Sequence, residues 1–476
     1  MQPKASPYLR VFRFLRSCFA WDRPFLRNLL IISLPMMLQE LLGASLHIID
    51  GMMVSGLGDA AYSGIIQANR YTFAFNLFLF GATSGGAIFI SQYWGARDIS
   101  RMRQAMGIAL GGALLVALVF MTGALLFPRQ IISVFLRPGE SFELSVAYLR
   151  IIAPGYVILA TNAIYATALK AAEKTYIPML AGVAGVLTNT AFNYMLIYGK
   201  LGFPALGVEG AAIATVLSSG VTLVINLGFA YGKRLPAGAR PKELLCRDKA
   251  FLGKFLKTVA PVVANEGLWG LGTTMFSVFY GVMGDVSIAA IGVSNTINDL
   301  VWVCVFGVTN AAAILVGKTL GEGQKERAYL YAKRLLATGL AGGLVLGLIL
   351  LTLRIPMVGL FTGLSQATRD KAQILIFIAG LGLCLRSFNC VNIVGVLRSG
   401  GDTLYSMLLD AGTMWLLSVP LVGLATLVFH WPIEIVFCLT YTDELVKLII
   451  GIPRFASRKW IHVLTSAKEE EALGNA

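Results

Sequence analysis

The apolar positions of this chain form long, nearly unbroken runs separated by short polar segments. A helix needs about 20 apolar residues to cross the ~30 Å hydrocarbon core of a bilayer. Strands of a membrane barrel would instead alternate polar and apolar residues, which this chain does not do. The pattern predicts an all-α integral membrane protein with twelve transmembrane helices, near residues 29–54, 62–94, 105–126, 146–169, 176–198, 208–231, 255–282, 288–317, 335–353, 373–397, 404–427 and 432–453.

The polar residues and glycines within these runs repeat after 226 residues. The paired positions are Pro35 with Pro261, Gln39 and Glu40 with Asn265 and Glu266, Gly58 and Asp59 with Gly284 and Asp285, Asn69 with Asn295, Gly81 with Gly307, Thr83 with Thr309, Gly95 with Gly321 and Arg101 with Arg327. Near the fourth and tenth spans the offset becomes 228, where KAAEKT at 170–175 aligns with RSGGDT at 398–403. Each half therefore holds six spans. Because six is even, we expect two parallel repeats related by an axis along the membrane normal.

The repeat and the polar segments together predict five regions. They are an amphipathic, cytoplasmic or interfacial amino terminus at 1–28, an amino-terminal six-helix lobe at 29–231, a basic cytoplasmic linker at 232–254, a carboxy-terminal six-helix lobe at 255–453 and a cytoplasmic tail at 454–476.

Composition agrees with a membrane protein and sets its orientation. Hydrophobic residues make up 57% of the 476 positions, charged residues 13%, and mean hydropathy is +0.73. The net charge of +14 does not indicate nucleic-acid binding, because 29 of the 39 Lys and Arg residues lie in alternate short segments and only 6 in the others. By the positive-inside rule the richer segments are cytoplasmic. We expect a multi-pass plasma membrane protein in the lipid bilayer with both termini in the cytoplasm.

Several function classes lack their sequence signals. No GxxxxGK[ST] loop, HExxH or GxSxG motif is present, and the three histidines and six cysteines have no metal-ligand spacing. The chain also lacks a TVGYG selectivity filter, which would indicate a channel. Two six-helix bundles around one axis suit alternating access instead. We therefore expect a transporter that needs no cofactor, and keep a channel and a membrane-embedded enzyme as lesser alternatives.

Ionisable residues inside the spans are the best functional candidates, because each costs about 2.5–3.5 kcal/mol at a helix centre. Glu40 and Glu266 occupy equivalent positions in the two repeats, where they can serve cation binding or only stabilise the bundle. Asp50 has no acidic counterpart, since the equivalent residue is Phe276. His47 lies three residues before Asp50 on the same helix face, where protonation would change the charge of the pair.

Further polar, charged and aromatic residues are candidates for lining a substrate cleft. For Arg70, Asp299, Arg386 and Asp410, ion pairing is the alternative to a direct role, and for the aromatic residues it is ordinary packing. The acids at 443 and 444 with Lys447 read as a local helix-stabilising arrangement. The candidates for the cleft are His47, Asn69, Arg70, Trp269, Asn295, Asp299, Arg386 and Ser387.

The chain resembles the multidrug and toxic compound extrusion family over residues 29–460. The resemblance rests on the two six-helix repeats and on the segments IIDGMMVSGLGDAAYSGI, SQYWGARD, GKTLGEGQ and LRSGGDT. It implies a V-shaped two-lobe transporter that acts as a monomer. It also implies export of organic cations, drugs or metabolites in exchange for protons or sodium ions. A lipid-linked or polysaccharide flippase of the same superfamily remains the alternative.

The resemblance assigns cation coupling to Asp50, which matches the family's first-helix aspartate, so Na⁺ could bind there as well as a proton. The acids that some members use in the seventh and tenth helices are not matched. Glu266 is displaced by about a turn, and Ser387, next to Arg386, takes the tenth-helix place. We therefore expect coupling to rest on the amino-terminal lobe.

Overall fold

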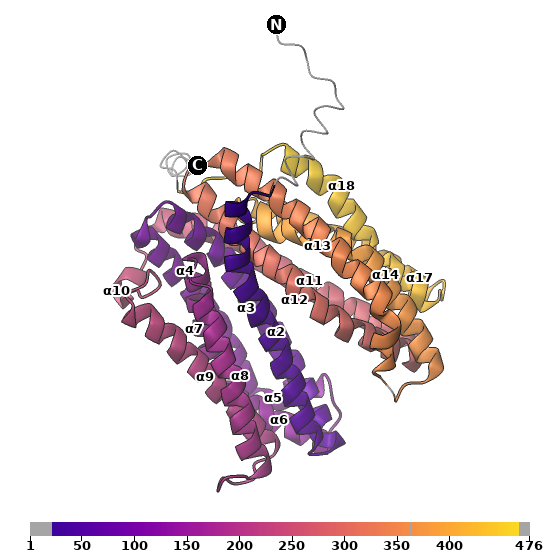
Figure 1. Cartoon of the computed structure of the whole chain (residues 1–476). Coiled ribbons are helices and arrows are strands. Elements are labelled where there is room, and N and C mark those ends of the chain that lie inside the picture. Colours follow the sequence, from indigo (N-terminus) through magenta and orange to yellow (C-terminus); the bar gives the residue numbers. More distant parts are fainter. Residues whose placement is uncertain (1–20, 362, 466–476) are drawn as a thin grey trace. The chain divides into compact units, whose positions relative to one another are not determined.

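The computed structural model describes residues 21–361 and 363–465, and within them every regular element is helical. The amino-terminal 20 residues, which include most of the predicted amphipathic segment, and residues 466–476 of the predicted tail lie outside the described part. Figure 1 shows the helices in chain order. The elements of the first repeat are α2 (Arg23–Ser55), α3 (Asp59–Gly95), α4 (Ile99–Leu126), α5 (Pro128–Ser133), α6 (Glu140–Ile152), α7 (Gly155–Ala171), α8 (Tyr176–Tyr198) and α9 (Val208–Gly232).

A short helix in the linker, α10 (Pro241–Leu244), precedes the second repeat, whose tenth and eleventh predicted spans contain stretches of π-helix. The elements of this half are α11 (Lys249–Val282), α12 (Asp285–Gly321), α13 (Lys325–Gly359), α14 (Gln366–Cys390), η1 (Val391–Leu397), α15 (Thr403–Met407), η2 (Leu408–Gly412), η3 (Met414–Ser418), α16 (Val419–Leu427), α17 (Ile433–Leu439) and α18 (Thr442–Ala456).

By length and composition, nine helices of the described chain can cross a membrane, or up to ten if the bent pair α6 and α7 forms one span. This pair bends by 50° at a break that contains Pro154, which has no backbone N–H to continue the helix. The two other predicted spans fall on α11 and on α17 with α18. The last of these is interrupted near Tyr441 into helices that are each too short to span alone.

The repeat found in the sequence is also present in the backbone. Helices α3 and α12 both contain 37 residues, and their boundaries differ by the offset of the repeat. Each begins after a glycine with positive φ, 102° at Gly58 and 89° at Gly284, which is a conformation that side chains other than glycine rarely adopt. Asp59 and Asp285 lie in the first turns, where the helix dipole favours a negative charge.

The chain forms two compact units whose boundaries differ from the lobes expected from the sequence. Among the described residues, one unit contains 21–37 and 268–465, and the other contains 38–267. The first half of α2 thus packs with the second repeat, and the first half of α11 with the first repeat. Equivalent glycines allow this packing: a Cβ on Gly81 would lie 2.8 Å from the Cα of Val263, and a Cβ on Gly307 would lie 2.2 Å from Met37. The lobes expected from the sequence, at 29–231 and 255–453, follow the repeats and stay a prediction.

Equivalent aspartates cap the first helix of each repeat. Asp22 accepts a hydrogen bond from the backbone N–H of Phe25 at 2.9 Å and pairs with Arg334 at 2.8 Å. Asp248, 226 residues later, accepts one from the N–H of Phe251 at 3.2 Å and pairs with Arg101 at 2.9 Å. In both cases the backbone hydrogen bond, and then the arginine, lowers the carboxyl pKa below its usual value of 3.8.

These caps predict a loss of stability in acid. A carboxyl whose pKa is lower in the folded state stabilises the fold fully above its unfolded pKa, and this contribution is lost as pH falls through the folded pKa. We expect the melting temperature in detergent to decrease when the pH is lowered below about 4. The double variant Asp22→Asn with Asp248→Asn should show a shallower decline, because asparagine still caps a helix but does not titrate. Identical pH profiles would contradict this role of the caps.

Candidate cation-coupling site and a buried charge network

Asp50, in the second half of α2, contacts an asparagine of α8, which in turn contacts a second asparagine of the same helix. The Nδ2 atom of Asn193 donates to Oδ1 of Asp50 at 2.5 Å and to Oδ1 of Asn189 at 2.9 Å. Asn189 and Asn193 are one turn apart, so they share a helix face, and both are fully buried. Among the described side chains, the charge that the sequence singled out therefore has a neutral amide as its hydrogen-bond partner and no ion pair.

A hydroxyl of α9 and a phenol of α6 complete this group. Asn189 donates to Oγ1 of Thr215 at 3.4 Å. The buried Tyr148 interacts with Thr215 and is within electrostatic range of Asp50. Among the described residues, Oδ1 of Asn193 has no hydrogen-bond partner although it is buried. An unsatisfied buried acceptor costs about 1–3 kcal/mol, so a donor or a cation at this position would stabilise the site.

Local packing explains why these side chains meet. Helices α8 and α9 pack closely because Gly210 has no side chain, and a Cβ there would lie 2.6 Å from the carbonyl oxygen of Leu196. The hydroxyl of Tyr198, at the end of α8, donates to the carbonyl oxygen of Met53 at 2.6 Å. This bond fixes the end of α2 one turn after Asp50.

The atoms with which this group can bind a cation are the carboxylate oxygens of Asp50 and the amide and hydroxyl oxygens of its neighbours. Carboxylate, amide and hydroxyl oxygens are the ligands that hard cations prefer, and the carboxylate can also take up a proton. Among the described residues no cluster of three or more His, Cys, Asp or Glu side chains could hold a metal. Asp50 with Asn189, Asn193 and Thr215 thus forms a candidate site whose ligand atoms are of the kind that a monovalent cation or a proton requires.

The two glutamates that are equivalent in sequence differ in their surroundings. Glu40 is exposed, and its carboxylate is within electrostatic range of Lys170 on α7. Glu266 is buried, 7% exposed, and lies beside the amide of Asn265, whose Nδ2 is 3.5 Å from its Oε1. Neither belongs to the group around Asp50, so the structure does not join the three proposed coupling residues into one site.

The other sequence candidates are dispersed. Arg70, Asn295 and Asp299 are exposed, and Asn69 is half-buried. Trp269 packs against the hydrophobic cluster of the unit that contains it. The hydroxyl of buried Ser387 donates to the carbonyl oxygen of Gly339 at 2.8 Å and so joins α14 to α13. The side chain of His47 lies outside the described part of the chain.

The second repeat contains a buried ion network centred on Lys447 of α18. Its Nζ atom lies 2.9 Å from Asp410 on η2, 2.8 Å from Asp443 and 3.8 Å from Glu444. Lys447 is 4% exposed. The sequence interpretation of the charges on α18 as a local arrangement was incomplete, because Lys447 also reaches the eleventh predicted span.

Two arginines and two amide or hydroxyl side chains extend the network. Nε of Arg386 lies 3.5 Å from Glu444, and its guanidinium stacks over the rings of Trp302 and Tyr441. The pairing that sequence favoured for Arg386 and Asp410 is therefore present, with partners that the sequence did not identify. Further contacts join Arg398 to Asp410 at 3.9 Å, Asn389 to Glu444 at 2.8 Å and Ser418 to Asp443 at 2.9 Å.

The network balances three carboxylates with three cations. Buried ion pairs are stabilised where hydrogen bonds satisfy their remaining atoms, and here Asn389 and Ser418 donate to two of the carboxylates. The sequence signal that could have revealed the network is the number of charged residues in the last predicted span, because every buried charge needs a partner. Spacing along α18 alone identified only the contacts within that helix.

The model of the MatE family matches residues 35–195 and 261–424, which are the corresponding parts of the two repeats. The chain belongs to the MATE family. Members of this family are transporters and not enzymes, so the chain is a multi-pass membrane transporter.

Relatives of this MATE chain are similar to it in sequence over most of its length. The uncharacterized transporter YisQ of Bacillus subtilis is 24% identical over 87% of this chain and 90% of its own length. The probable multidrug resistance protein NorM of Thermotoga maritima is 24% identical over 91% of this chain and 93% of its own.

Solved MATE structures have the same fold. A MATE in complex with MaL6 has a TM-score of 0.81 and 20% identity, over 94% of this chain and 97% of that one. An outward-facing multidrug resistance MATE family transporter also has a TM-score of 0.81 with 20% identity, over 91% of this chain and 96% of that one. These similarities confirm the predicted all-α, two-repeat fold.

Proposed function

We propose that this MATE transporter exports organic cations or related small molecules in exchange for a monovalent cation that binds at Asp50. The observation that carries the proposal is the group around Asp50, in which the half-buried carboxylate accepts from a neutral amide and, among the described side chains, has no ion pair. A carboxylate that is partly withdrawn from water and has no counter-ion beside it gains from taking up a proton or Na⁺. The relatives named as probable multidrug resistance proteins support a small-molecule substrate.

The network around Lys447 supports placing the coupling ion in the first repeat. Its carboxylates already have cationic partners within the chain, at 2.8 Å for Asp443 and 2.9 Å for Asp410. A coupling cation would have to displace the ammonium group of Lys447 to gain the same contacts. We therefore assign the network to stability and the Asp50 group to coupling.

Exchange follows from linked binding. If the cation and the substrate bind different conformations preferentially, each lowers the affinity for the other by the same factor, and a gradient of one drives the other across the membrane. In that arrangement Asp50 needs to gain and lose one positive charge per cycle. Its neutral neighbours leave its charge free to change without breaking an ion pair.

The test is efflux of a fluorescent organic cation from proteoliposomes that contain the purified full chain. A proton gradient and a sodium gradient are imposed in turn, with protein-free liposomes as the control. We expect one of the two gradients to drive efflux and thereby to identify the coupling ion. No efflux of several dyes under either gradient would reject the antiporter and favour the lipid-linked or polysaccharide flippase.

A further inference from the structure

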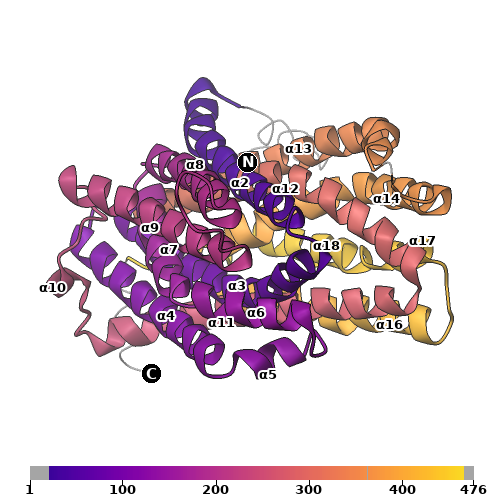
Figure 2. The ribbon, with the colours of Figure 1, turned by 90° about the horizontal axis from the view of Figure 1, so that it is seen from below.

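The basic linker is held firmly against the start of α4, beside which α10 lies in both views (Figures 1 and 2). Arg103 donates to Glu243 at 2.9 Å and to the carbonyl oxygen of Pro236 at 3.1 Å. Gly107 allows the closest approach, because a Cβ there would lie 1.9 Å from the carbonyl oxygen of Leu244. The linker is thus a fixed surface and can form a binding site.

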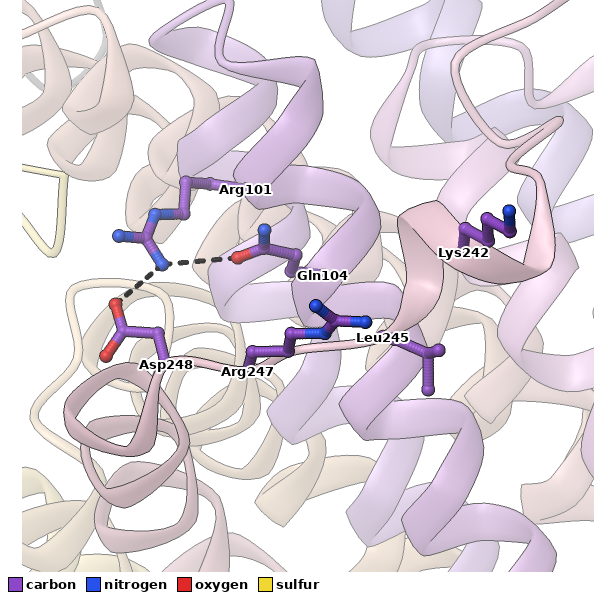
Figure 3. A pocket seen from close by; sticks show the side chains of 6 residues that line it. All are labelled: Arg101, Gln104, Lys242, Leu245, Arg247 and Asp248. Carbon is purple, nitrogen blue, oxygen red and sulfur yellow. Dashed lines mark hydrogen bonds and ion pairs between the residues drawn. The ribbon is translucent and has the colours of Figure 1, made fainter.

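Beside this contact lies a pocket of about 720 Å³. That volume is in the range of about 300–1,000 Å³ typical of small-molecule sites. Three of the six lining residues are cationic and one is acidic, so the lining carries an excess of two positive charges. Figure 3 shows Arg101 bridging Gln104 and Asp248, with Arg247 alongside and Lys242 farther along the linker; the remaining lining residue is Leu245.

The donors of the pocket are arranged for an anion. Nη1 of Arg101 is held by Asp248 at 2.9 Å and by Oε1 of Gln104 at 3.2 Å, which fixes the guanidinium and leaves Nε2 of Gln104 as a further donor. Lys242 and Arg247 are exposed, and neither makes an ion pair within the described part of the chain. An added anion would therefore meet two uncompensated cations and one amide donor.

An apolar side chain in the pocket lining indicates that the anion is part of a lipid. The pocket lies next to the first turn of α4 and the first turn of α11, where the apolar part of each helix begins. Leu245, which lines the pocket, is 63% exposed, and Leu256 on α11 is 53% exposed. An exposed leucine in the lining of a cationic pocket, with a second exposed leucine two turns farther along α11, suits a lipid whose headgroup lies on the cations and whose acyl chains lie on Leu245.

We propose that this pocket binds the phosphate headgroup of an anionic membrane lipid. Arg247 and Lys242 supply charge, Gln104 and Arg101 supply donors, and Leu245 contacts the acyl chains. A single bound lipid would contact the linker, α4 and the start of α11 at the same time. The site is separate from the coupling site at Asp50 and does not depend on the ion that drives transport.

Binding of dioleoyl phosphatidic acid to the purified full chain tests the proposal. The chain is held in zwitterionic detergent, and bound lipid is measured by native mass spectrometry against dioleoyl phosphatidylcholine. We expect preferential binding of phosphatidic acid. The double variant Lys242→Gln with Arg247→Gln should bind it about 30-fold more weakly, from about 1 kcal/mol for each basic residue near a lipid phosphate.

The matched control is Lys233→Gln with Arg234→Gln, which removes the same charges from the same linker outside the pocket. It should bind phosphatidic acid as the wild type does. Equal losses in both double variants would overturn the proposal in favour of diffuse surface charge. Displacement of the lipid by millimolar inorganic phosphate would show a soluble anion to be the ligand. Gln104→Leu, which changes no charge, should also weaken binding, and unchanged binding in both pocket variants would reject the site.

Discussion

Asp50→Asn is expected to reduce gradient-driven export to the level of protein-free liposomes while the protein remains folded. An asparagine at this position keeps the shape of the side chain, and its Oδ1 can still accept from Nδ2 of Asn193, so the contact between α2 and α8 persists. It cannot take up a proton, and it offers a cation no formal charge. The measurement is efflux of the dye under the driving gradient, together with a melting curve in detergent.

The matched control for this prediction is Asp59→Asn, the same substitution nine positions later at an exposed site in the first turn of α3. We expect export to continue in this variant. Export by Asp50→Asn at the rate of the wild type would remove Asp50 from the coupling mechanism. Loss of export together with a large fall in melting temperature would assign Asp50 to folding instead.

Lys447→Met is expected to destabilise the protein strongly, by about 3–5 kcal/mol, as is typical when one partner of a buried ion pair is removed. Methionine fills a similar volume but leaves three carboxylates, on Asp410, Asp443 and Glu444, to face only two arginines. The free energy of unfolding, measured with denaturant in detergent, should fall accordingly.

A second substitution separates loss of charge balance from loss of packing. Lys447→Met combined with Asp443→Asn restores equal numbers of buried positive and negative groups, so we expect it to regain much of the lost stability. Such coupling between neighbouring charges appears as a large non-additive term in a double-mutant cycle. Stability of Lys447→Met equal to that of the wild type would show that the network is not needed for the fold.

Asp50 was predictable because a charge within an apolar span needs a partner or a function, and because the otherwise regular repeat has no acid at Phe276. Its partners were not predictable. Asn189, Asn193 and Thr215 lie on helices that the chain reaches about 140 residues or more after Asp50, and many buried polar residues of that kind only pack or cap helices. Side-chain spacing reports neighbours on one helix, whereas the site draws on several.

The equivalence of Glu40 and Glu266 shows the same limit from the other side. The repeat correctly assigned them corresponding positions, yet one is exposed near Lys170 and the other is buried beside Asn265. Identical motifs acquire different surroundings, because the residues around them differ between the repeats. A role inferred for one cannot be transferred to its counterpart.

The sequence by itself determined the helical class, the two six-helix repeats and the family. These depend on the length of the apolar runs and on glycines and prolines at a constant offset, and both are properties of the local chain. Only the tertiary structure decided that Lys447 reaches Asp410 and that Asp50 meets the asparagines of α8. It also decided that the first halves of α2 and α11 belong to the opposite unit. Such pairings are set by which helix faces pack together, and the pattern of apolar residues within a membrane span does not encode that choice, because lipid and neighbouring helices are equally apolar surroundings.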